Sequence, residues 1–325
     1  MTVVIPSRNR SRIVFDLLRY LRQDLEWDCP IIVVDQSDDG GRELHALLQA
    51  RTSWQVEHIY QDRRGTGCAR NEGALAATTP WLLFLDDDVR PVPHYLEAIV
   101  QFIETNPWVD AAQGFTDQRD GWDIYQQRPE TWRLNAPPAT AQRMILMQDR
   151  DGVEYFSLSP FARYETLTVG IGSGNFAIRR SCFHAIGGFD EQIEGRGDDS
   201  EFGLRLWWYG YRSCLCPAAV VFHLREESGG TRETPSFFSR LLAPEPCPGW
   251  TYFYMKWFPG TPYHQMIVWQ VLRWLRRPWA LPIKLARLRN SIVEARRRLL
   301  AGPIYLSAPT PRTSLSLRRS HSAGN

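Results

Sequence analysis

Short apolar runs alternate with longer amphipathic stretches along the first hundred residues. Apolar runs with the length of buried strands cover 3–5, 31–34, 56–60 and 81–85. Apolar residues at helical spacing fall between them, over 11–23, 42–50 and 68–77. Strands and helices in strict alternation predict an α/β protein, with a mostly parallel sheet flanked by helices.

The regular pattern stops at residue 117 and resumes near 168. Residues 117–165 are irregular and contain several prolines and aromatic residues, so we expect a long insertion beside the functional site. A strand is predicted over 168–178, and helices from Ser181 and over 200–209. The catalytic part is expected to end within 223–232.

Apolar residues at helical spacing return over 263–275 and 281–299, with arginines beside them. Residues 262–325 contain 12 basic residues and one acidic residue, so this stretch carries +11 and residues 1–261 carry −9. One interpretation is that the helices bind an anionic membrane surface through arginines and through Trp269, Trp274 and Trp279. The alternative is that they pack on the catalytic part or on a second subunit. From Gly302 onward the composition predicts disorder.

Composition narrows the class of protein. With 43% hydrophobic and 23% charged residues among 325, the chain is expected to be globular. The six cysteines have no CxxC spacing, so neither a zinc site nor a disulfide framework is indicated. No stretch has the roughly 18 uncharged apolar residues of a membrane span. The first residues form a strand pattern without a signal-peptide pattern, so we expect a cytosolic protein, at most peripheral on the cytoplasmic face of a membrane.

Three consecutive carboxylates, Asp86, Asp87 and Asp88, follow the run at 81–85. Ligands of open α/β sheets bind beyond the carboxyl ends of the strands, where these residues lie. Adjacent like charges repel unless a cation neutralises them, and an oxygen-rich cluster suits Mg²⁺ or Mn²⁺ bound together with substrate phosphates. The alternative is an acidic loop that caps a helix beginning near Pro93.

Three later residues are further candidates for catalysis or ligand binding. Asp198 and Asp199 follow two glycines at a predicted helix start, where one of them could act as a general base or, alternatively, as an N-cap. His223 ends an apolar run and could bind a metal or a phosphate, although a lone histidine is more often structural.

The motifs, taken in order, resemble the family 2 glycosyltransferases, which are inverting enzymes with the GT-A fold. The matching runs are Val3-Val4-Ile5-Pro6-Ser7-Arg8-Asn9-Arg10, Val33-Val34-Asp35-Gln36-Ser37, Gly67 to Gly73 with Ala69-Arg70-Asn71, Phe84-Leu85-Asp86-Asp87-Asp88, Gly172-Ser173-Gly174-Asn175-Phe176-Ala177-Ile178-Arg179-Arg180, Ile186-Gly187-Gly188-Phe189-Asp190-Glu191, Asp198-Asp199 and His223. The resemblance covers residues 2 to 230.

The resemblance implies a role for each matching residue. Asp199 would be the catalytic base, and Asp88 with His223 would hold the metal. The donor would be bound by Pro6, Arg8, Asp35, Arg70, Asp86 and Asp87. Gly174, Asn175 and Asp198 would lie on the acceptor and sugar side. Relatives commonly have Glu where this chain has Asp198, and their Asp-Asp-Gly-Ser loop is replaced here by Asp35-Gln36-Ser37.

The resemblance also implies a division of the chain. Residues 1–116 would form the nucleotide-sugar-binding half, 117–165 the insertion, and 166–232 the acceptor and catalytic half. A basic amphipathic helical extension would follow over 233–301, and a disordered tail over 302–325.

The expected reaction moves a sugar from a UDP-, GDP- or dTDP-sugar to a saccharide or lipid-linked acceptor. Such a reaction would belong to cell-envelope, polysaccharide or glycolipid synthesis. Nucleic acid is not an expected partner. Asp199 is expected to be ionised at neutral pH, as an ordinary aspartate is. A non-catalytic nucleotide-sugar-binding or assembly protein on the same fold is the main alternative. A sugar nucleotidyltransferase is disfavoured, because it would need a glycine-rich loop after the first strand. The loop at that position here, Pro6-Ser7-Arg8-Asn9, contains no glycine.

Overall fold

The structure of the protein is a computed structural model that describes residues 1–118, 122–123, 126–127, 147–148, 154–155, 171–193, 197–224, 226, 229–230, 248–258, 268 and 281–310. Its strands are β1 (Thr2–Ser7), β2 (Ile31–Asp35), β3 (Val56–Tyr60), β4 (Trp81–Leu85), β5 (Val89–Pro91), β6 (Ala111–Gln118), β7 (Met147–Gln148), β8 (Glu154–Tyr155), β9 (Asn175–Arg179) and β10 (Ser213–His223). Its α-helices are α1 (Ser11–Arg19), α2 (Arg42–Gln49), α3 (Thr66–Ala76), α4 (Tyr95–Thr105), α6 (Arg180–Ala185), α7 (Asp198–Trp208), α9 (Pro248–Trp257) and α11 (Leu281–Ala301). Short helical segments cover Tyr20–Asp24, which continues α1 as a π-helix, and Thr52–Trp54.

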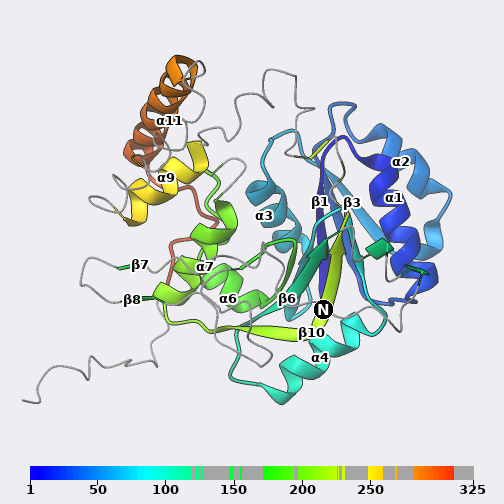
Figure 1. Cartoon of the computed structure of the whole chain (residues 1–325). Helices are drawn as coiled ribbons and strands as arrows, with labels where there is room; N and C mark the ends of the chain where they lie inside the picture. Colours follow the sequence, from blue (N-terminus) through cyan, green and yellow to red (C-terminus); the bar gives the residue numbers. More distant parts are fainter. Residues whose placement is uncertain are drawn as a thin grey trace, which may run out of the picture.

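Eight strands form one sheet in the order β3-β2-β1-β4-β9-β6-β10-β5 (Figure 1). The first four strands along the chain pair in parallel, as their alternation with helices predicts. Strand β9 runs antiparallel to β4 and β6, and β5 runs antiparallel to β10, whereas β10 pairs with β6 in parallel. The predicted mostly parallel α/β sheet is therefore confirmed.

Helices cover both faces of the sheet, so successive residues of a central strand are buried on opposite sides. In β1, Val3 and Ile5 belong to the core cluster under α1, α2 and α4, whereas Val4 belongs to the cluster that contains residues of α3, α6 and α7. Figure 1 shows α1 and α2 on one side of the sheet and α3 and α7 on the other. Burial on both faces explains why the central strands read as continuous apolar runs.

Two features of the sheet go beyond the predicted pattern. The three-residue strand β5 stands between the aspartates and α4, and it pairs with the end of β10. Strand β10 changes register between Cys216 and Val220. Pro217 lies in this bulge, where its missing N–H leaves no ladder hydrogen bond unmade.

The C-terminal helices pack on the part of the chain that carries α7. Helices α9 and α11 contact each other, and Lys284, Leu288, Ser291, Ala295 and Arg298 of α11 are buried. Residues 302–310, for which composition predicts disorder, run along α6 instead: the Leu306 N–H donates to Gly187 O at 2.8 Å and the Thr310 N–H to Ala185 O at 2.7 Å. Backbone hydrogen bonds hold this segment where its side-chain composition gives no signal.

A buried group of charges joins α9 to α7, and we call Asp190, Glu201, Arg205 and Lys256 the ionic cluster. Lys256 Nζ lies 2.7 Å from Asp190 Oδ2 and 2.8 Å from Glu201 Oε1. Arg205 Nη2 lies 2.9 Å from Glu201 Oε2. The cluster contains two acidic and two basic side chains, so its charges balance.

Several predictions fall outside the described residues. Most of the insertion 117–165 is among these, as are Trp269, Trp274 and Trp279 and all of the helix predicted over 263–275 except residue 268. Within the described part of the chain, no helix is long and apolar enough to cross a membrane.

Candidate active site

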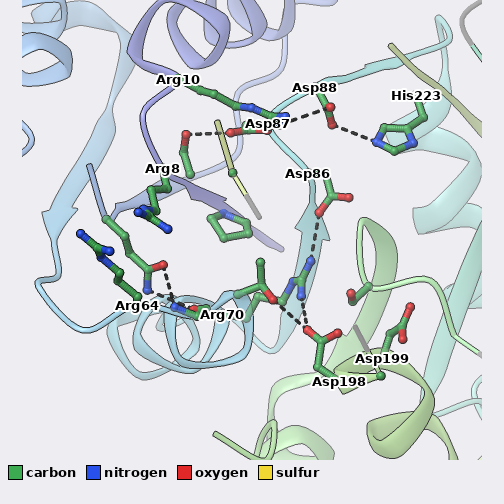
Figure 2. A pocket seen from close by; sticks show the side chains of 18 of the residues that line it. Arg8, Arg10, Arg64, Arg70, Asp86, Asp87, Asp88, Asp198, Asp199 and His223 are labelled. Carbon is green, nitrogen blue, oxygen red and sulfur yellow. Dashed lines mark hydrogen bonds and ion pairs between the residues drawn. The ribbon is translucent and has the colours of Figure 1, made fainter. Parts of the chain in front are cut away.

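A cavity of about 710 Å³ opens at the carboxyl ends of β1 and β4, beside the first turns of α3 and α7. It is lined by Pro6, Ser7, Arg8, Arg10, Gln36, Arg64, Gly65, Thr66, Arg70, Asp86, Asp87, Asp88, Ser173, Gly197, Asp198, Asp199, His223, Gly230 and Trp250. Figure 2 shows Arg8 and Arg64 on the left, Asp198 and Asp199 at the lower right, and Asp86 above these two aspartates. The cavity thus brings together most of the residues that the sequence pattern selects.

Asp86, Asp88 and His223 converge on one point of this cavity. Each offers one ligand atom, and the three atoms lie within 4.8 Å of one another. Strand pairing explains the convergence, because His223 stands opposite Val89 in the β10–β5 register, next to Asp88 in the chain. His223 Nε2 lies 3.0 Å from Asp88 Oδ1. Two carboxylates and an imidazole form a donor set that suits Mn²⁺ or a similar divalent ion.

Asp87 differs from its two neighbours because it does not belong to this group of ligand atoms, and its carboxylate contacts Ser7 and Arg10 instead. It accepts a hydrogen bond from Ser7 Oγ at 2.7 Å and lies 2.7 Å from Arg10 Nη1. Burial raises the pKa of Asp87 to about 6, and the charge of Asp88 adds to the shift while Arg10 opposes it. None of the three aspartates caps a helix, since β5 intervenes and the N-cap of α4 is His94.

Arg70 links the aspartate triplet to the start of α7. Its Nη2 donates to Asp86 Oδ1 and its Nη1 to Asp198 Oδ2, both at 3.0 Å (Figure 2). Thr66 Oγ1 donates to the same Asp198 oxygen, also at 3.0 Å. Asp198 therefore ties α3 to α7. Gly174 leaves room for this arrangement, because a Cβ there would lie 2.2 Å from Asp86 Oδ2.

Asp199 lies in the first turn of α7, where Gly197 adopts φ 108° as the N-cap. Neither Asp198 nor Asp199 is the N-cap, but together with Glu201 they form an acidic first turn, which favours a helix start. Burial and the adjacent charge of Asp198 raise the pKa of Asp199 to about 7. This corrects the expectation of an ordinary, fully ionised aspartate at neutral pH, because the local environment disfavours its charged form.

The part of the cavity that lies away from Asp199 is basic. Arg8 and Arg64 flank Asp38, with Arg64 Nη2 2.7 Å and Arg8 Nη2 3.6 Å from Asp38 Oδ1. The Nε atoms of Arg8 and Arg70 are buried without a hydrogen-bond partner among the described residues. Buried donors without acceptors are uncommon in folded proteins, and at the wall of a cavity they favour an anionic ligand.

Three of the selected residues stand outside the cavity lining. Asp35 is buried behind it and accepts hydrogen bonds from the Ser37 backbone and side chain. Asn175 donates to Phe115 O at 2.8 Å and accepts from the Tyr95 hydroxyl, so its side chain joins β9, β6 and α4. Gly174 contacts the site through Asp86, as described above. These residues support the walls of the cavity from behind.

Several lining residues were not selected as site residues from the sequence, and Arg10 and Trp250 are two of them. Arg10 pairs with Asp87 and also lies 3.3 Å from Asp88 Oδ2. Its place in the motif with Arg8 is the only sequence signal for it. Trp250 comes from α9, beyond the expected end of the catalytic part at 223–232. A cluster of aromatic residues from Trp250 to Phe258 marks this helix but does not reveal where it packs.

The family model for Glycosyl transferase family 2 matches residues 2–184, which is more than half of the chain. The chain belongs to this family. As a family 2 glycosyltransferase, it is similar to validoxylamine A glucosyltransferase of Streptomyces hygroscopicus subsp. jinggangensis (strain 5008), with 29% identity over 231 residues, 65% of this chain and 52% of that protein. It is 25% identical to chondroitin synthase of Escherichia coli over 253 residues, 72% of this chain and 36% of that protein. It therefore spans about half the length of the first and just over a third of the second.

Solved structures show the same fold. The crystal structure of S. aureus TarS 1–349 in complex with UDP-GlcNAc matches this family 2 chain with a TM-score of 0.54 and 16% identity, covering 90% of this chain and 78% of that one. The crystal structure of GalNAc-T7 with UDP, GalNAc and Mn²⁺ matches with a TM-score of 0.53 and 18% identity, covering 78% and 49%. These likenesses confirm the GT-A-type α/β fold expected from the motif order.

Proposed function

We propose that this chain transfers a sugar from a nucleoside diphosphate donor to an acceptor hydroxyl, with a divalent cation at Asp86, Asp88 and His223 and with Asp199 as the general base. The observation that carries this proposal is the convergence of three metal-type ligands in the same cavity as Asp199, in a chain of glycosyl transferase family 2. Family and fold alone do not fix an activity, so the proposal depends on this site.

The charges of the cavity support a cation-assisted reaction. Five aspartates and four arginines line it, a net charge of −1 with His223 neutral. A nucleoside diphosphate would add further negative charge to a wall that already has an excess of carboxylates. A divalent cation would reverse the sign of the site, and the arginine end would then take the remaining donor charge.

The residues fit such a cation, because two carboxylates and an imidazole are its common ligands and their ligand atoms already lie within 4.8 Å. When bound, Mg²⁺ or Mn²⁺ would stabilise the negative charge that develops on the departing diphosphate. Arg70, which lies against Asp86, would hold that carboxylate in place, and Arg8 would bind the donor with its unpaired Nε.

Asp199 would accept the proton of the acceptor hydroxyl as its oxygen attacks the anomeric carbon. A pKa of about 7 suits this role, because a general base works best when its pKa lies near the operating pH. Attack from the face opposite the diphosphate makes a single displacement, and this would invert the anomeric centre. The solved structures of this fold with UDP and Mn²⁺ or with UDP-GlcNAc support a nucleotide-sugar donor by analogy.

The experiment that tests this function is incubation of the protein with Mn²⁺ and separate UDP-, GDP- and dTDP-sugars, followed by measurement of released nucleoside diphosphate. We expect slow release to water from at least one donor and complete loss with EDTA. Binding of a donor without any release, with or without saccharide acceptors, would instead indicate a nucleotide-sugar-binding protein without transferase activity.

The location of the acceptor is a separate part of the proposal. Arg289 and Arg296 lie one heptad apart on the exposed side of α11, and they add to a C-terminal stretch that carries +11. We propose that this surface binds anionic headgroups and so brings a lipid-linked acceptor to the cavity. Changing both residues to Glu in the full chain should abolish sedimentation with phosphatidylglycerol vesicles. Unchanged sedimentation of the variant would argue against this surface, and absence of wild-type sedimentation would argue against membrane binding.

A further inference from the structure

Trp250 stands apart from every other described residue of the cavity wall. The remaining lining residues are charged, polar, glycine or proline, so this indole is the one large apolar surface of the described wall. The indole is partly exposed, and its ring centroid lies 5.5 Å from that of Phe253 and 6.1 Å from that of Tyr254. The diphosphate of the proposed donor offers no apolar surface to pack against it.

The start of α9, which carries Trp250, lies against the start of α7, which carries Asp199. A Cβ at Gly197 would lie 3.5 Å from the backbone of Gly249 and from the nitrogen of Trp250. Gly197 immediately precedes the two aspartates of α7. The indole is therefore on the side of the cavity that holds Asp199.

The ionic cluster fixes this arrangement. Lys256, on the same helix as Trp250, pairs with Glu201 at 2.8 Å, and Glu201 is on the same helix as Asp199. Tyr252 adds a hydrogen bond to Asp190 Oδ2 at 2.8 Å. Because these contacts are buried, Trp250 is held in a set position relative to Asp199.

We infer that Trp250 binds the acceptor, by packing its ring against the apolar C–H face of a pyranose whose hydroxyl points to Asp199. This rests on the proposed function and names the acceptor class as a saccharide. Aromatic side chains offer a large rigid surface at low entropic cost, while a few polar groups orient the ligand. Here the carboxylates of Asp198 and Asp199 supply the polar groups.

The test compares W250A and W250F with W108A, which removes the exposed Trp108 outside the cavity wall. The probes are methyl glycosides of glucose, mannose and N-acetylglucosamine. Saturation-transfer NMR with Mg²⁺ and UDP measures their binding, and steady-state kinetics with Mn²⁺ measure transfer. We expect W250A to raise the acceptor KM about tenfold or more, which corresponds to roughly 1.4 kcal/mol. W250F should lie between W250A and wild type, and W108A should match wild type.

The donor KM and the Mn²⁺ affinity should stay unchanged in W250A, because the indole belongs neither to the metal ligands nor to the arginines proposed to bind the donor. An unchanged acceptor KM in W250A, or a parallel rise in donor and acceptor KM, would overturn the inference. So would a wild type that releases diphosphate but binds none of the glycosides. If wild type releases no diphosphate from any donor, the proposed function itself fails, and that result is distinct.

Discussion

Helix α7 contributes acidic side chains to two neighbouring regions with opposite properties. In the ionic cluster, Glu201 is fully buried and lies within 3 Å of both Arg205 and Lys256. Burial alone would raise the pKa of Glu201, but these two cations outweigh it and lower the pKa to about 2. In the cavity, Asp199 has no basic partner within ion-pair distance among the described residues, and its pKa rises to about 7.

The comparison separates charge that holds the fold from charge that is open to a ligand. The ionic cluster balances two acids with two bases, so it needs nothing from outside the chain. The cavity has more carboxylates than arginines and groups three metal-type ligands. Uncompensated charge of this kind is costly in a folded protein and is found at functional sites.

The largest expected effect follows from removing the charge of Asp199. D199N should lower kcat by about 10²–10⁴, the usual contribution of a general base. The free energy of unfolding should not fall, because the wild-type carboxyl has no ion pair to lose. Diphosphate release and chemical denaturation measure the two quantities. Activity within fivefold of wild type would remove Asp199 from the proposed role.

The opposite outcome is expected in the ionic cluster. E201Q should lower the free energy of unfolding by about 3–5 kcal/mol, because it leaves Arg205 and Lys256 buried without their partner. The matched control is E43Q on α2, whose partner Arg12 is exposed, and it should cost about 1 kcal/mol or less. Urea unfolding measures the free energy of unfolding of both variants. An equal decrease in the two variants would contradict the distinction between buried and exposed ion pairs.

The same carboxylate predicts acid sensitivity. The pKa of Glu201 is lower in the folded protein than the ordinary value near about 4.3, so its contribution is complete above that pH and is lost as the pH falls toward 2. The free energy of unfolding of wild type should decline more steeply over this window than that of E201Q. Parallel pH curves would show that the pair does not stabilise the fold.

Metal binding should stabilise only a protein with an intact metal group. At a hundredfold excess over its Kd, Mn²⁺ should raise the free energy of unfolding of wild type by about 2.7 kcal/mol. D88N should lose this stabilisation, whereas D62N, at an exposed position away from the cavity, should keep it. Thermal unfolding with and without Mn²⁺ gives the comparison, and a D88N response equal to wild type would exclude Asp88 as a ligand.

The smallest expected effect is on the pH profile of activity. Because the base form of Asp199 is required and its pKa is about 7, kcat/KM should fall about tenfold for each pH unit below neutrality and level off above it. D199N should lack this limb. A profile that is flat from pH 5 to 7 would indicate that an ordinary, fully ionised carboxylate acts at these pH values.

The strand and helix order was predictable because each element carries its own periodicity. The runs at 3–5, 31–34, 56–60 and 81–85 all became strands of one sheet. The short strand β5 was not predictable, because its three residues are held by pairing with β10, more than a hundred residues later. Residues 302–310 are held by backbone hydrogen bonds and by the side chains of Tyr305 and Leu306, and these contacts with distant segments likewise leave no periodic signal.

The sequence by itself determined the family, the order of the strands, and the identity of Asp88, Asp199 and His223 as candidates, because these depend on local pattern and motif order. Only the tertiary structure decided which partner each of the three aspartates contacts. Strand register brings His223 to Asp88, the β1 loop turns Arg10 toward Asp87, and α3 sets Arg70 against Asp86. It also brought Trp250 to the cavity wall. Contacts between distant segments arise from tertiary packing, and no local stretch of residues predicts that packing.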